Sequence, residues 1–344
     1  MLLKNFRPQS RLVTKATHID RPSFPVVDAH NHLADPFGGG WDRKPLAELL
    51  DLLDAARVTH YVDLDGGWGE EILESHLDYF KNAAPDRFQI FGGVEWFRWQ
   101  KLGDAFPEWA AKRLHAQKKR GAQGLKIWKP LGLHVEDHNN KLVDVDDERL
   151  IPIWETAGEV GLPVLIHVAD PVAFFDPVDE TNERWEEIGE HPDWAFTSPP
   201  YPPFMHILNS LKNLVKRHPH TTFIGAHVGC YGENLGWVGQ MLEECPNYYI
   251  DISARLGELG RQPYTARRFF IQYQDRILFG LDAGPNLEEY RLSYRFLETD
   301  DEYFNYNTRD VPAQGRWYVC GMYLPDDVLK KVYSENARRV LGIA

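Results

Sequence analysis

The sequence has few cysteines and no long hydrophobic run. Its 344 residues include three cysteines, Cys230, Cys245 and Cys320. An odd number without close spacing indicates neither a disulfide framework nor a thiolate zinc site. No stretch approaches the roughly 18 apolar residues of a membrane helix, and residues 1–15 hold too few apolar side chains for a secretory signal. We therefore expect a cytoplasmic protein with no membrane partner.

The sequence also lacks an excess of positive charge. It has 38 lysines plus arginines against 51 aspartates plus glutamates, which gives a net charge of −13 at pH 7 with neutral histidine. Nucleic acids and anionic membranes attract proteins through cationic surfaces, so no nucleic-acid partner is expected. A local cationic pocket for a small-molecule substrate is compatible with this charge.

Short apolar segments alternate with helical patterns along the chain. Eight segments are predicted to be buried strands: 24–27, 59–64, 88–92, 124–128, 163–168, 222–226, 248–252 and 277–279. Amphipathic segments lie between them, including 45–56, 150–160, 205–217 and 259–273. Apolar strands that are each followed by a helix are typical of a closed parallel barrel. The pattern therefore predicts an α/β fold, a (β/α)8 TIM barrel.

Two segments are longer than a minimal barrel needs. The connection from His167 to Met205 is rich in proline and aromatic residues, which predicts an ordered roof inserted after the fifth strand. After the eighth strand, helices are predicted at 287–297 and 326–341, with Gly342 ending the second. No linker-like stretch divides the chain. We expect one domain over residues 1–344, with the barrel at about 24–300 and a C-terminal helical extension covering it at about 301–344.

Candidate metal ligands stand at the carboxyl ends of the predicted strands. His30 and His32 lie two positions apart on an extended segment, so they point to the same side and can share one ion. His167 ends the fifth predicted strand, His227 the sixth and Asp282 the eighth. Each alone is more simply a buried structural residue or a helix cap. Because all strand ends of a parallel barrel open onto one face, the five together indicate a shared site.

These segments resemble the amidohydrolase superfamily, in particular its amidohydrolase-related branch of metal-dependent hydrolases, lactonases and decarboxylases. The resemblance rests on an ordered set spread over most of the chain: VVDAHNHL, GLKIW, GLPVLIHVADP, FIGAHVG, YYIDIS, FGLDAGP and YSENARRVLGI. It implies that His30, His32, His167 and Asp282 bind one divalent metal, with His227 as the catalytic histidine beside it. A homodimer is suggested by the resemblance alone.

Lys126 leaves the number of metal ions open. It lies on the predicted fourth strand, where binuclear relatives in the superfamily carry a carboxylated lysine that bridges two metals. The branch resemblance favours one metal with Lys126 as a cation near the substrate, and an ordinary ion pair with a neighbouring carboxylate is an equal alternative. Three imidazoles and one carboxylate suit Zn²⁺ best, with Mn²⁺ or another divalent ion as alternatives.

The expected chemistry is hydrolysis with a metal-activated water. Asp282 would accept the proton of the water and return it to the leaving group, and His227 would either polarise the scissile carbonyl or orient the water. Lys126 and Arg255 would hold a substrate carboxylate. Five tryptophans at or after strand ends either form aromatic walls around the substrate or pack the loops: Trp41, Trp68, Trp96, Trp99 and Trp128.

The leading interpretation is thus a metal-dependent hydrolase of a small cyclic or carboxylated substrate, with Trp128 among its substrate-binding residues. The alternative is a metal-dependent non-oxidative decarboxylase, in which Asp282 would protonate carbon. A third interpretation is a non-catalytic, metal-stabilised barrel. Product analysis separates the first two, and the phenotype of His227→Ala tests the third.

Overall fold

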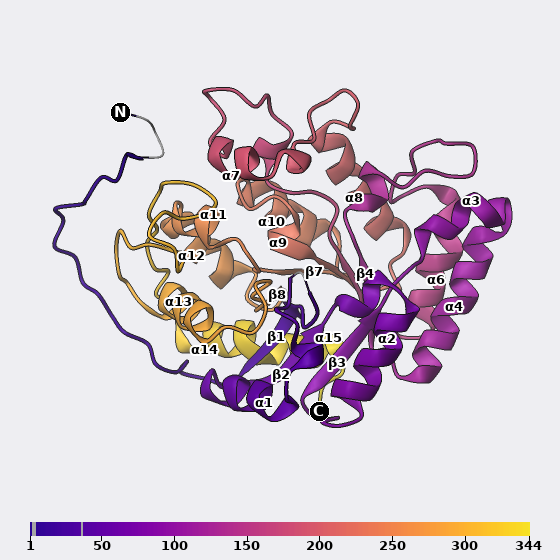
Figure 1. Ribbon diagram of the computed structural model, residues 1–344, viewed down its shortest axis with the longest axis horizontal. Coiled ribbons are helices and arrows are strands. Elements are labelled where there is room, and N and C mark those ends of the chain that lie inside the picture. Colours follow the sequence, from indigo (N-terminus) through magenta and orange to yellow (C-terminus); the bar gives the residue numbers. More distant parts are fainter. Residues whose placement is uncertain (2–4, 36) are drawn as a thin grey trace.

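The computed structural model describes residues 1, 5–35 and 37–344, and its centre is a sheet of eight parallel strands (Figure 1). The sheet runs in chain order from β1 to β8. The strands are β1 (Val26–Asn31), β2 (Val58–Asp63), β3 (Phe88–Gly92), β4 (Gly124–Ile127), β5 (Val164–Ile166), β6 (Phe223–Gly225), β7 (Tyr248–Asp251) and β8 (Ile277–Leu278). Backbone hydrogen bonds from Ala29 N to Phe279 O (2.9 Å) and from Asp282 N to His30 O (3.0 Å) join the last strand region to the first. The predicted (β/α)8 barrel is therefore confirmed.

Helices lie between successive strands and cover the barrel wall (Figure 1). Their bounds are α1 (Leu46–Ala55), α2 (Glu70–His76), α3 (Trp99–Leu102), α4 (Phe106–Arg120), α5 (Pro130–Leu133), α6 (Ile151–Glu159), α7 (Trp185–Glu190), α8 (Phe204–Arg217), α9 (Ala226–Gly229), α10 (Leu235–Glu244), α11 (Leu256–Gly260), α12 (Pro263–Gln272), α13 (Leu287–Glu298), α14 (Asp326–Lys330) and α15 (Asn336–Leu341).

The helical segment predicted at 259–273 is confirmed over α12 but is not continuous, because its first residues belong to a separate helix, α11. The break falls at Gln262, whose backbone lies outside the helical region at φ −128° and ψ 51°. Gln262 precedes Pro263, and the proline ring disfavours the helical conformation of the residue before it. All eight predicted strands overlap the observed ones, with ends displaced by up to a few residues.

The barrel interior and the C-terminal helix share one apolar cluster. Its residues come from the strand segments and from α15: Val27, Ala29, Val62, Leu64, Phe91, Leu165, Ile224, Ala226, Leu278, Ala337 and Leu341. Asn336, at the start of α15, donates from Nδ2 to the carbonyl oxygens of Gln274 (2.7 Å) and Ile277 (2.8 Å). The helix from α14 to α15 includes a π-helical turn at Lys331–Glu335, and Gly342 ends it at φ +64°, as the sequence predicts.

The segment after β5 forms an ordered roof that contains α7. Asn182 fastens it internally by donating from Nδ2 to the carbonyl oxygens of Ala173 (2.7 Å) and Pro177 (3.0 Å). Arginine–glutamate pairs fasten it to other parts of the fold, including Arg184 with Glu258 of α11, Glu183 with Arg261 (2.7 Å) and Glu186 with Arg316 (2.6 Å). The roof is therefore held by contacts within itself, with the β7–α12 region and with the C-terminal segment.

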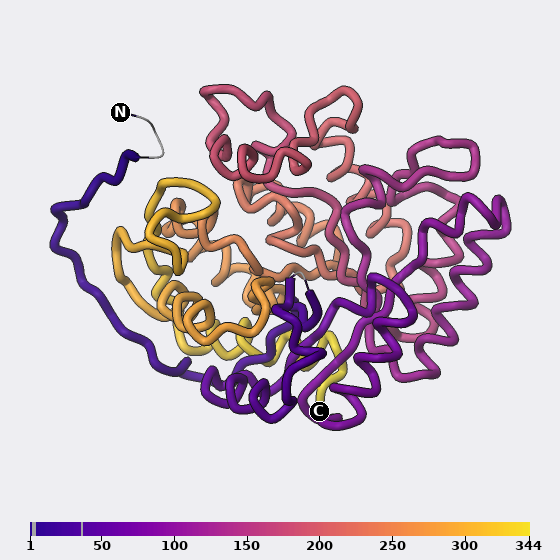
Figure 2. The backbone as a smooth tube through the Cα atoms, in the orientation of Figure 1, coloured from indigo at the N-terminus to yellow at the C-terminus, as the bar shows by residue number. Residues whose placement is uncertain are grey.

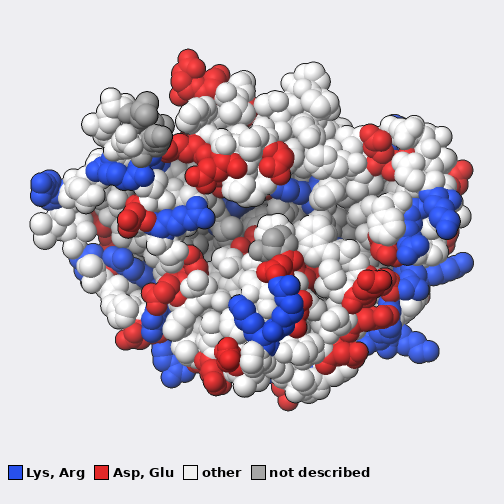
Figure 3. All heavy atoms as spheres, in the orientation of Figure 1, with Lys and Arg blue, Asp and Glu red and all other residues white. Residues whose placement is uncertain are grey.

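Residues 5–25 run as an extended segment along the outside of the fold before β1 begins (Figure 2). This segment contacts the loop after α13, where Thr17 donates to Asp301 from its backbone N (2.6 Å) and its Oγ1 (2.7 Å). Acidic and basic side chains are interspersed over the face drawn in Figure 3. Within the described ranges, no helix combines the length and apolar character required to cross a membrane.

Candidate metal centre and active site

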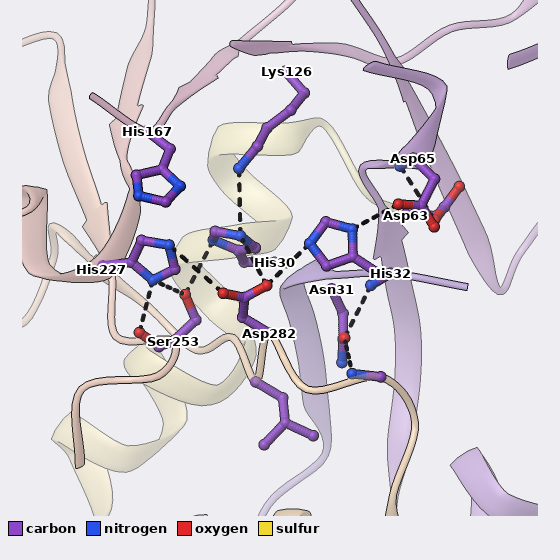
Figure 4. Close-up of polar contacts among 12 residues, drawn as sticks. His30, Asn31, His32, Asp63, Asp65, Lys126, His167, His227, Ser253 and Asp282 are labelled. Atoms are coloured by element: carbon purple, nitrogen blue, oxygen red, sulfur yellow. Dashed lines mark hydrogen bonds and ion pairs between the residues drawn. The ribbon is translucent and has the colours of Figure 1, made fainter. Parts of the chain in front are cut away.

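Three of the predicted metal ligands meet at the carboxyl ends of β1 and β8. Oδ1 of Asp282 lies 3.0 Å from Nε2 of His32 and 3.6 Å from Nε2 of His30. One ligand atom from each of the three lies within 4.8 Å of the other two. The side chains point toward one another in the close-up, with Lys126 approaching from β4 (Figure 4). The strand-end geometry thus brings together residues that are about 250 positions apart in the sequence.

A buried carboxylate stands behind each of the two β1 histidines. Nδ1 of His30 lies 2.8 Å from Oδ2 of Asp251, and Nδ1 of His32 lies 2.8 Å from Oδ1 of Asp65. A carboxylate only accepts hydrogen bonds when ionised, so each histidine donates from Nδ1 and presents Nε2 to the site. Outer carboxylates of this kind fix the tautomer and ring orientation of metal-binding histidines.

His227 follows β6 on a run of left-handed backbone. His227, Val228 and Cys230 have φ of 57°, 59° and 62°, and Asp282, which follows β8, has φ 57°. Such conformations are strained for residues with side chains and persist where surrounding contacts hold them. Here the backbone N of His227 donates to Oδ1 of Asp251 (3.1 Å). The turn places Nε2 of His227 at 3.6 Å from Oδ2 of Asp282.

The tautomer of His227 follows from its hydrogen bond to Ser253. Nδ1 lies 3.0 Å from the carbonyl oxygen of Ser253 and 3.0 Å from its Oγ. A carbonyl oxygen can only accept, so Nδ1 carries the hydrogen and Nε2 of the neutral ring is an acceptor. Burial, together with the nearby positive charge of Arg255, holds the pKa of His227 well below its ordinary value and favours this neutral form.

His167 lies beside His227 rather than within the closest ligand group. The two ring centroids are 4.4 Å apart. Nε2 of His167 is buried and makes no hydrogen bond to the residues that the structure describes, with Oδ1 of Asp170 at 3.4 Å. Burial lowers the pKa of His167 to about 4. A neutral, buried imidazole whose nitrogen is not used in a hydrogen bond within the described ranges is a suitable metal ligand.

The charges of the cluster are strongly coupled. Burial opposes a charge on His32, but the hydrogen bonds that Asp282 and Asp65 accept from its ring outweigh it and raise the pKa of His32 to about 9. Burial alone would raise the pKa of Asp282, whereas His30, His32 and His227 hold it well below its usual range. Burial lowers the pKa of Lys126 to about 8, and its Nζ lies 3.4 Å from Nε2 of His30. The centre therefore holds an ionised carboxylate among nitrogen donors.

This donor set fits a divalent metal ion. The Nε2 atoms of His30 and His32 and a carboxylate oxygen of Asp282 already converge, and the outer nitrogens of both β1 histidines are occupied. Among the residues described, His167 offers a buried nitrogen without a hydrogen bond. Two further groups have ligand atoms equally close together, His30–His227–Asp251 and Asp63–Asp65–His76. Most of their polar atoms already bond to one another or to backbone groups.

The cluster opens into a cavity of about 360 Å³ with one strongly aromatic wall. The ring of His32 stacks on Trp128 (5.4 Å between centroids), Trp128 stacks on Trp68 (4.1 Å), and Trp68 stacks on Phe37 (6.4 Å). This volume lies within the range of small-ligand sites. The wall leads from the candidate metal ligands to the outer rings of Phe37 and Trp68, which are 52% and 46% exposed.

Three cations line the same cavity, and two of them are already paired. Lys129 binds Asp170 of the roof, and Arg184 binds Glu187 (2.7 Å) and Glu258. Arg255 follows β7 and is 5% exposed. It forms no ion pair with any residue in the described ranges, and its one side-chain hydrogen bond there runs from Nη1 to the carbonyl oxygen of Ala254 (2.9 Å).

The tryptophan prediction divides into two groups. Trp68 and Trp128 line the cavity. Trp99 is buried and stacks on Phe106 (4.7 Å), and Trp96 also packs on Phe106 (5.8 Å). Trp41, the fifth, lies under the ammonium group of Lys44. Aromatic wall and loop packing, the two alternatives, are therefore both present, at different positions.

Several residues of the site, behind the candidate ligands or lining the cavity, were missed by sequence reasoning. Asp65 and Asp251 stand at strand ends like the predicted ligands, and that position was an available signal. The others come from the roof and the C-terminal segment, where no periodic pattern places a side chain in the barrel: Asp170, Phe174, Arg184, Glu187, Trp194 and Gln314.

Fold and site together define a TIM-barrel protein whose strand ends carry a candidate metal centre. Residues 27–343 match the family model described as Amidohydrolase. The chain therefore belongs to the amidohydrolase superfamily of enzymes, which confirms the resemblance seen in the sequence. Among curated protein sequences, none matches this chain.

Solved structures share the fold at low sequence identity. A 2,6-dihydroxybenzoate decarboxylase from Rhizobium is 16% identical, covers 93% of this chain and 99% of its own, and has a TM-score of 0.57. A dihydroxybenzoic acid decarboxylase from a Polaromonas species, with bound manganese and the inhibitor 2-nitroresorcinol, is 16% identical over 87% and 86% of the two chains (TM-score 0.53). A probable 2-pyrone-4,6-dicarboxylic acid hydrolase from Acinetobacter baumannii, with citric acid bound, is 12% identical over 93% and 100% (TM-score 0.51).

Proposed function

We propose that this protein is a metal-dependent hydrolase of a small, planar molecule that carries a carboxylate. In this proposal His30, His32, His167 and Asp282 hold one divalent metal, and Zn²⁺ is the ion best suited to the three imidazoles and one carboxylate. The metal would supply Lewis-acid activation of water and of the scissile bond. Manganese in a structural neighbour supports Mn²⁺ as the alternative ion.

The tautomer of His227 is the observation that favours hydrolysis. Its Nδ1 donates to the carbonyl oxygen of Ser253, so the neutral ring has no proton at Nε2 to polarise a substrate carbonyl. It can instead accept a hydrogen bond and orient the attacking water. Oδ2 of Asp282, on the side of the carboxylate that faces His227, then accepts the proton of the water and delivers it to the leaving group.

The cavity supports the substrate class. Its stacked aromatic wall favours a flat ring or conjugated system, and the guanidinium of Arg255, which is not ion-paired within the described part of the chain, suits a carboxylate. Lys126 would lie beside the metal ligands as a second cation near the reacting group. The aromatic dihydroxy acids and the pyrone dicarboxylate named for the structural neighbours are planar acids of this kind.

Non-oxidative decarboxylation is the second candidate. Several structural neighbours are decarboxylases of hydroxylated aromatic acids, and the same pocket would bind such an acid. The two reactions differ in the proton donor that they need, because decarboxylation requires delivery of a proton to carbon. Neither Nε2 of neutral His227 nor ionised Asp282 carries a proton at the start, so in a decarboxylase one of these two groups would first have to be protonated.

The test is product analysis on metal-reconstituted protein supplied with planar lactones, cyclic amides and hydroxylated aromatic acids. Incorporation of ¹⁸O from labelled water into an acid product is expected. Release of carbon dioxide without ¹⁸O incorporation would overturn hydrolysis in favour of decarboxylation.

The role of His227 has a separate test. His227→Asn should lower kcat by about 10²- to 10⁴-fold while the metal stays bound. His218→Asn is the control, because His218 is a buried histidine outside the cavity, and it should leave kcat unchanged.

A further inference from the structure

The C-terminal segment contributes a side chain to the cavity beside Arg255. Gln314, from the segment between α13 and α14, lines the cavity together with Ala254 and Arg255. Its Nε2 lies 3.3 Å from the carbonyl oxygen of Ala254. Because that carbonyl can only accept, the amide nitrogen of Gln314 faces it. Gln314 is therefore connected to the β7 strand end although it lies about 60 residues further along the chain.

Gln314 and Arg255 share one anchor. The carbonyl oxygen of Ala254 accepts from Nη1 of Arg255 (2.9 Å) and from Nε2 of Gln314 (3.3 Å). Ala254 has a left-handed backbone with φ 52°, a conformation that alanine adopts at a cost and that surrounding contacts must hold. The shared carbonyl fixes the guanidinium and the carboxamide next to each other on the cavity wall.

This pair has unused hydrogen-bond donors of the kind that a carboxylate needs. Arg255 carries five N–H groups, and the bond to Ala254 is its one hydrogen bond from the side chain in the part of the chain that is described. Gln314 keeps a second amide hydrogen. The neighbouring cations differ, since Lys129 and Arg184 both have carboxylate partners. A planar carboxylate can accept from a guanidinium and an adjacent amide at once.

We infer that Gln314 and Arg255 form a carboxylate subsite apart from the metal ligands, and that Gln314 is a specificity-determining residue. The inference rests on the proposed function, because it concerns the substrate of that same cavity. The substrate then presents two polar ends: the reacting group lies at the metal centre, and a carboxylate on the same flat molecule binds Arg255 and Gln314. The C-terminal segment therefore takes part in substrate selection as well as covering the barrel.

Binding of benzoate and of the three benzenedicarboxylates to the metal-loaded protein tests this subsite. Titration calorimetry on the wild type should show at least one dicarboxylate binding about tenfold or more tightly than benzoate, since its second carboxylate reaches the pair. In Gln314→Glu the new carboxylate pairs with Arg255, so the dicarboxylate should lose its advantage and bind about as tightly as benzoate. Arg255→Gln should lose it as well.

Gln100→Glu is the matched control. Gln100 also donates from Nε2 to a backbone carbonyl, that of Asp137 (2.7 Å), and it lies outside the cavity lining. The dicarboxylate advantage should survive there unchanged. Metal content, measured by elemental analysis, should be the same in all four proteins.

The outcomes separate this inference from the proposed function. An advantage that persists in Gln314→Glu but disappears in Arg255→Gln overturns the role of Gln314 and leaves the proposed substrate class in place. The absence of any dicarboxylate advantage in the wild type overturns the subsite. Failure of the metal-loaded wild type to hydrolyse any planar acid, with the advantage intact, counts against the proposed reaction while the subsite stands.

Discussion

Nδ1 of His32 lies 2.8 Å from Oδ1 of Asp65, so a candidate metal ligand is held by a carboxylate from the next strand end. The other oxygen of Asp65 accepts from the backbone N–H groups of Leu33 and Ala34, both at 2.8 Å. The carboxylate therefore fixes both the ring of His32 and the chain that follows it. Removing the charge of Asp65 should therefore lower the affinity for the metal.

Asp65→Asn is expected to weaken metal binding by about 10- to 100-fold, because loss of a carboxylate behind a ligating histidine has this effect. Competition with a chromophoric chelator measures it. Asp137→Asn is the control, since Asp137 is also a buried carboxylate that accepts from two backbone N–H groups (Asn139 and Lys141) but stands away from the metal ligands. Equal loss of affinity in both variants would remove the positioning role of Asp65.

Purified protein should contain about one equivalent of metal, as expected for a single site with one set of ligands. His32→Ala and His167→Ala should lose metal and activity together, measured by elemental analysis and product formation. Two equivalents, accompanied by a mass increase that maps to Lys126, would instead support the carboxylated-lysine alternative. Retention of full metal content in His167→Ala would show that His167 is not a ligand.

Gly67→Ala should disturb the aromatic wall without touching a metal ligand. A Cβ at position 67 would lie 2.7 Å from Nε1 of Trp128 and 2.9 Å from Cβ of Lys126, closer than packed atoms allow. Overpacking of this kind costs about 1–3 kcal/mol. We expect a lower Tm, a changed tryptophan emission and weaker binding of planar acids.

Gly189→Ala is its matched control, because a Cβ there meets no atom within 4 Å and the residue lies within α7. Higher helix propensity should leave this variant as stable as the wild type or up to about 1 kcal/mol more stable. Unchanged binding of planar acids in Gly67→Ala would contradict a substrate-facing role for Trp128.

Asn336→Ala should destabilise the whole chain by about 1–3 kcal/mol, because it removes hydrogen bonds to one buried and one partly buried carbonyl oxygen. Chemical denaturation measures the change. We propose that residues 1–344 form one domain, so barrel and C-terminal cover should unfold in a single transition. Asn213→Ala, which removes an exposed bond to Asp146, should stay within about 0.5 kcal/mol of the wild type. Two separate transitions in Asn336→Ala would contradict the single domain.

Glu70 should contribute to acid sensitivity. Burial alone would raise its pKa, but Arg113, Arg120 and Gln117 bind the carboxylate and lower the pKa to about 2. A lowered folded-state pKa stabilises the protein above the ordinary value near 4.5, and this stability is lost as the pH falls toward 2. Glu70→Gln should therefore be less stable than the wild type at pH 6, and the difference should shrink toward pH 2. Urea midpoints at several pH values measure it.

The sequence by itself determined the barrel and the placement of the candidate ligands at its strand ends. Apolar strands followed by helices restrict the topology to a parallel closed sheet, and a parallel sheet brings His30, His32, His167, His227 and Asp282 to one face whatever the details of packing. The exact strand ends were less accessible, because end residues are decided by neighbouring strands and by turns such as the left-handed run at His227.

Only the tertiary structure decided what surrounds those ligands. Hydrogen bonds across the barrel choose the tautomers of His30, His32 and His227, and no local pattern encodes partners that are tens to hundreds of positions away. The roof and the C-terminal segment add Arg184 and Gln314 to the cavity in the same way. Packing also decides which cations of the cavity are ion-paired. Lys129 and Arg184 have carboxylate partners, whereas Arg255 has none within the described ranges.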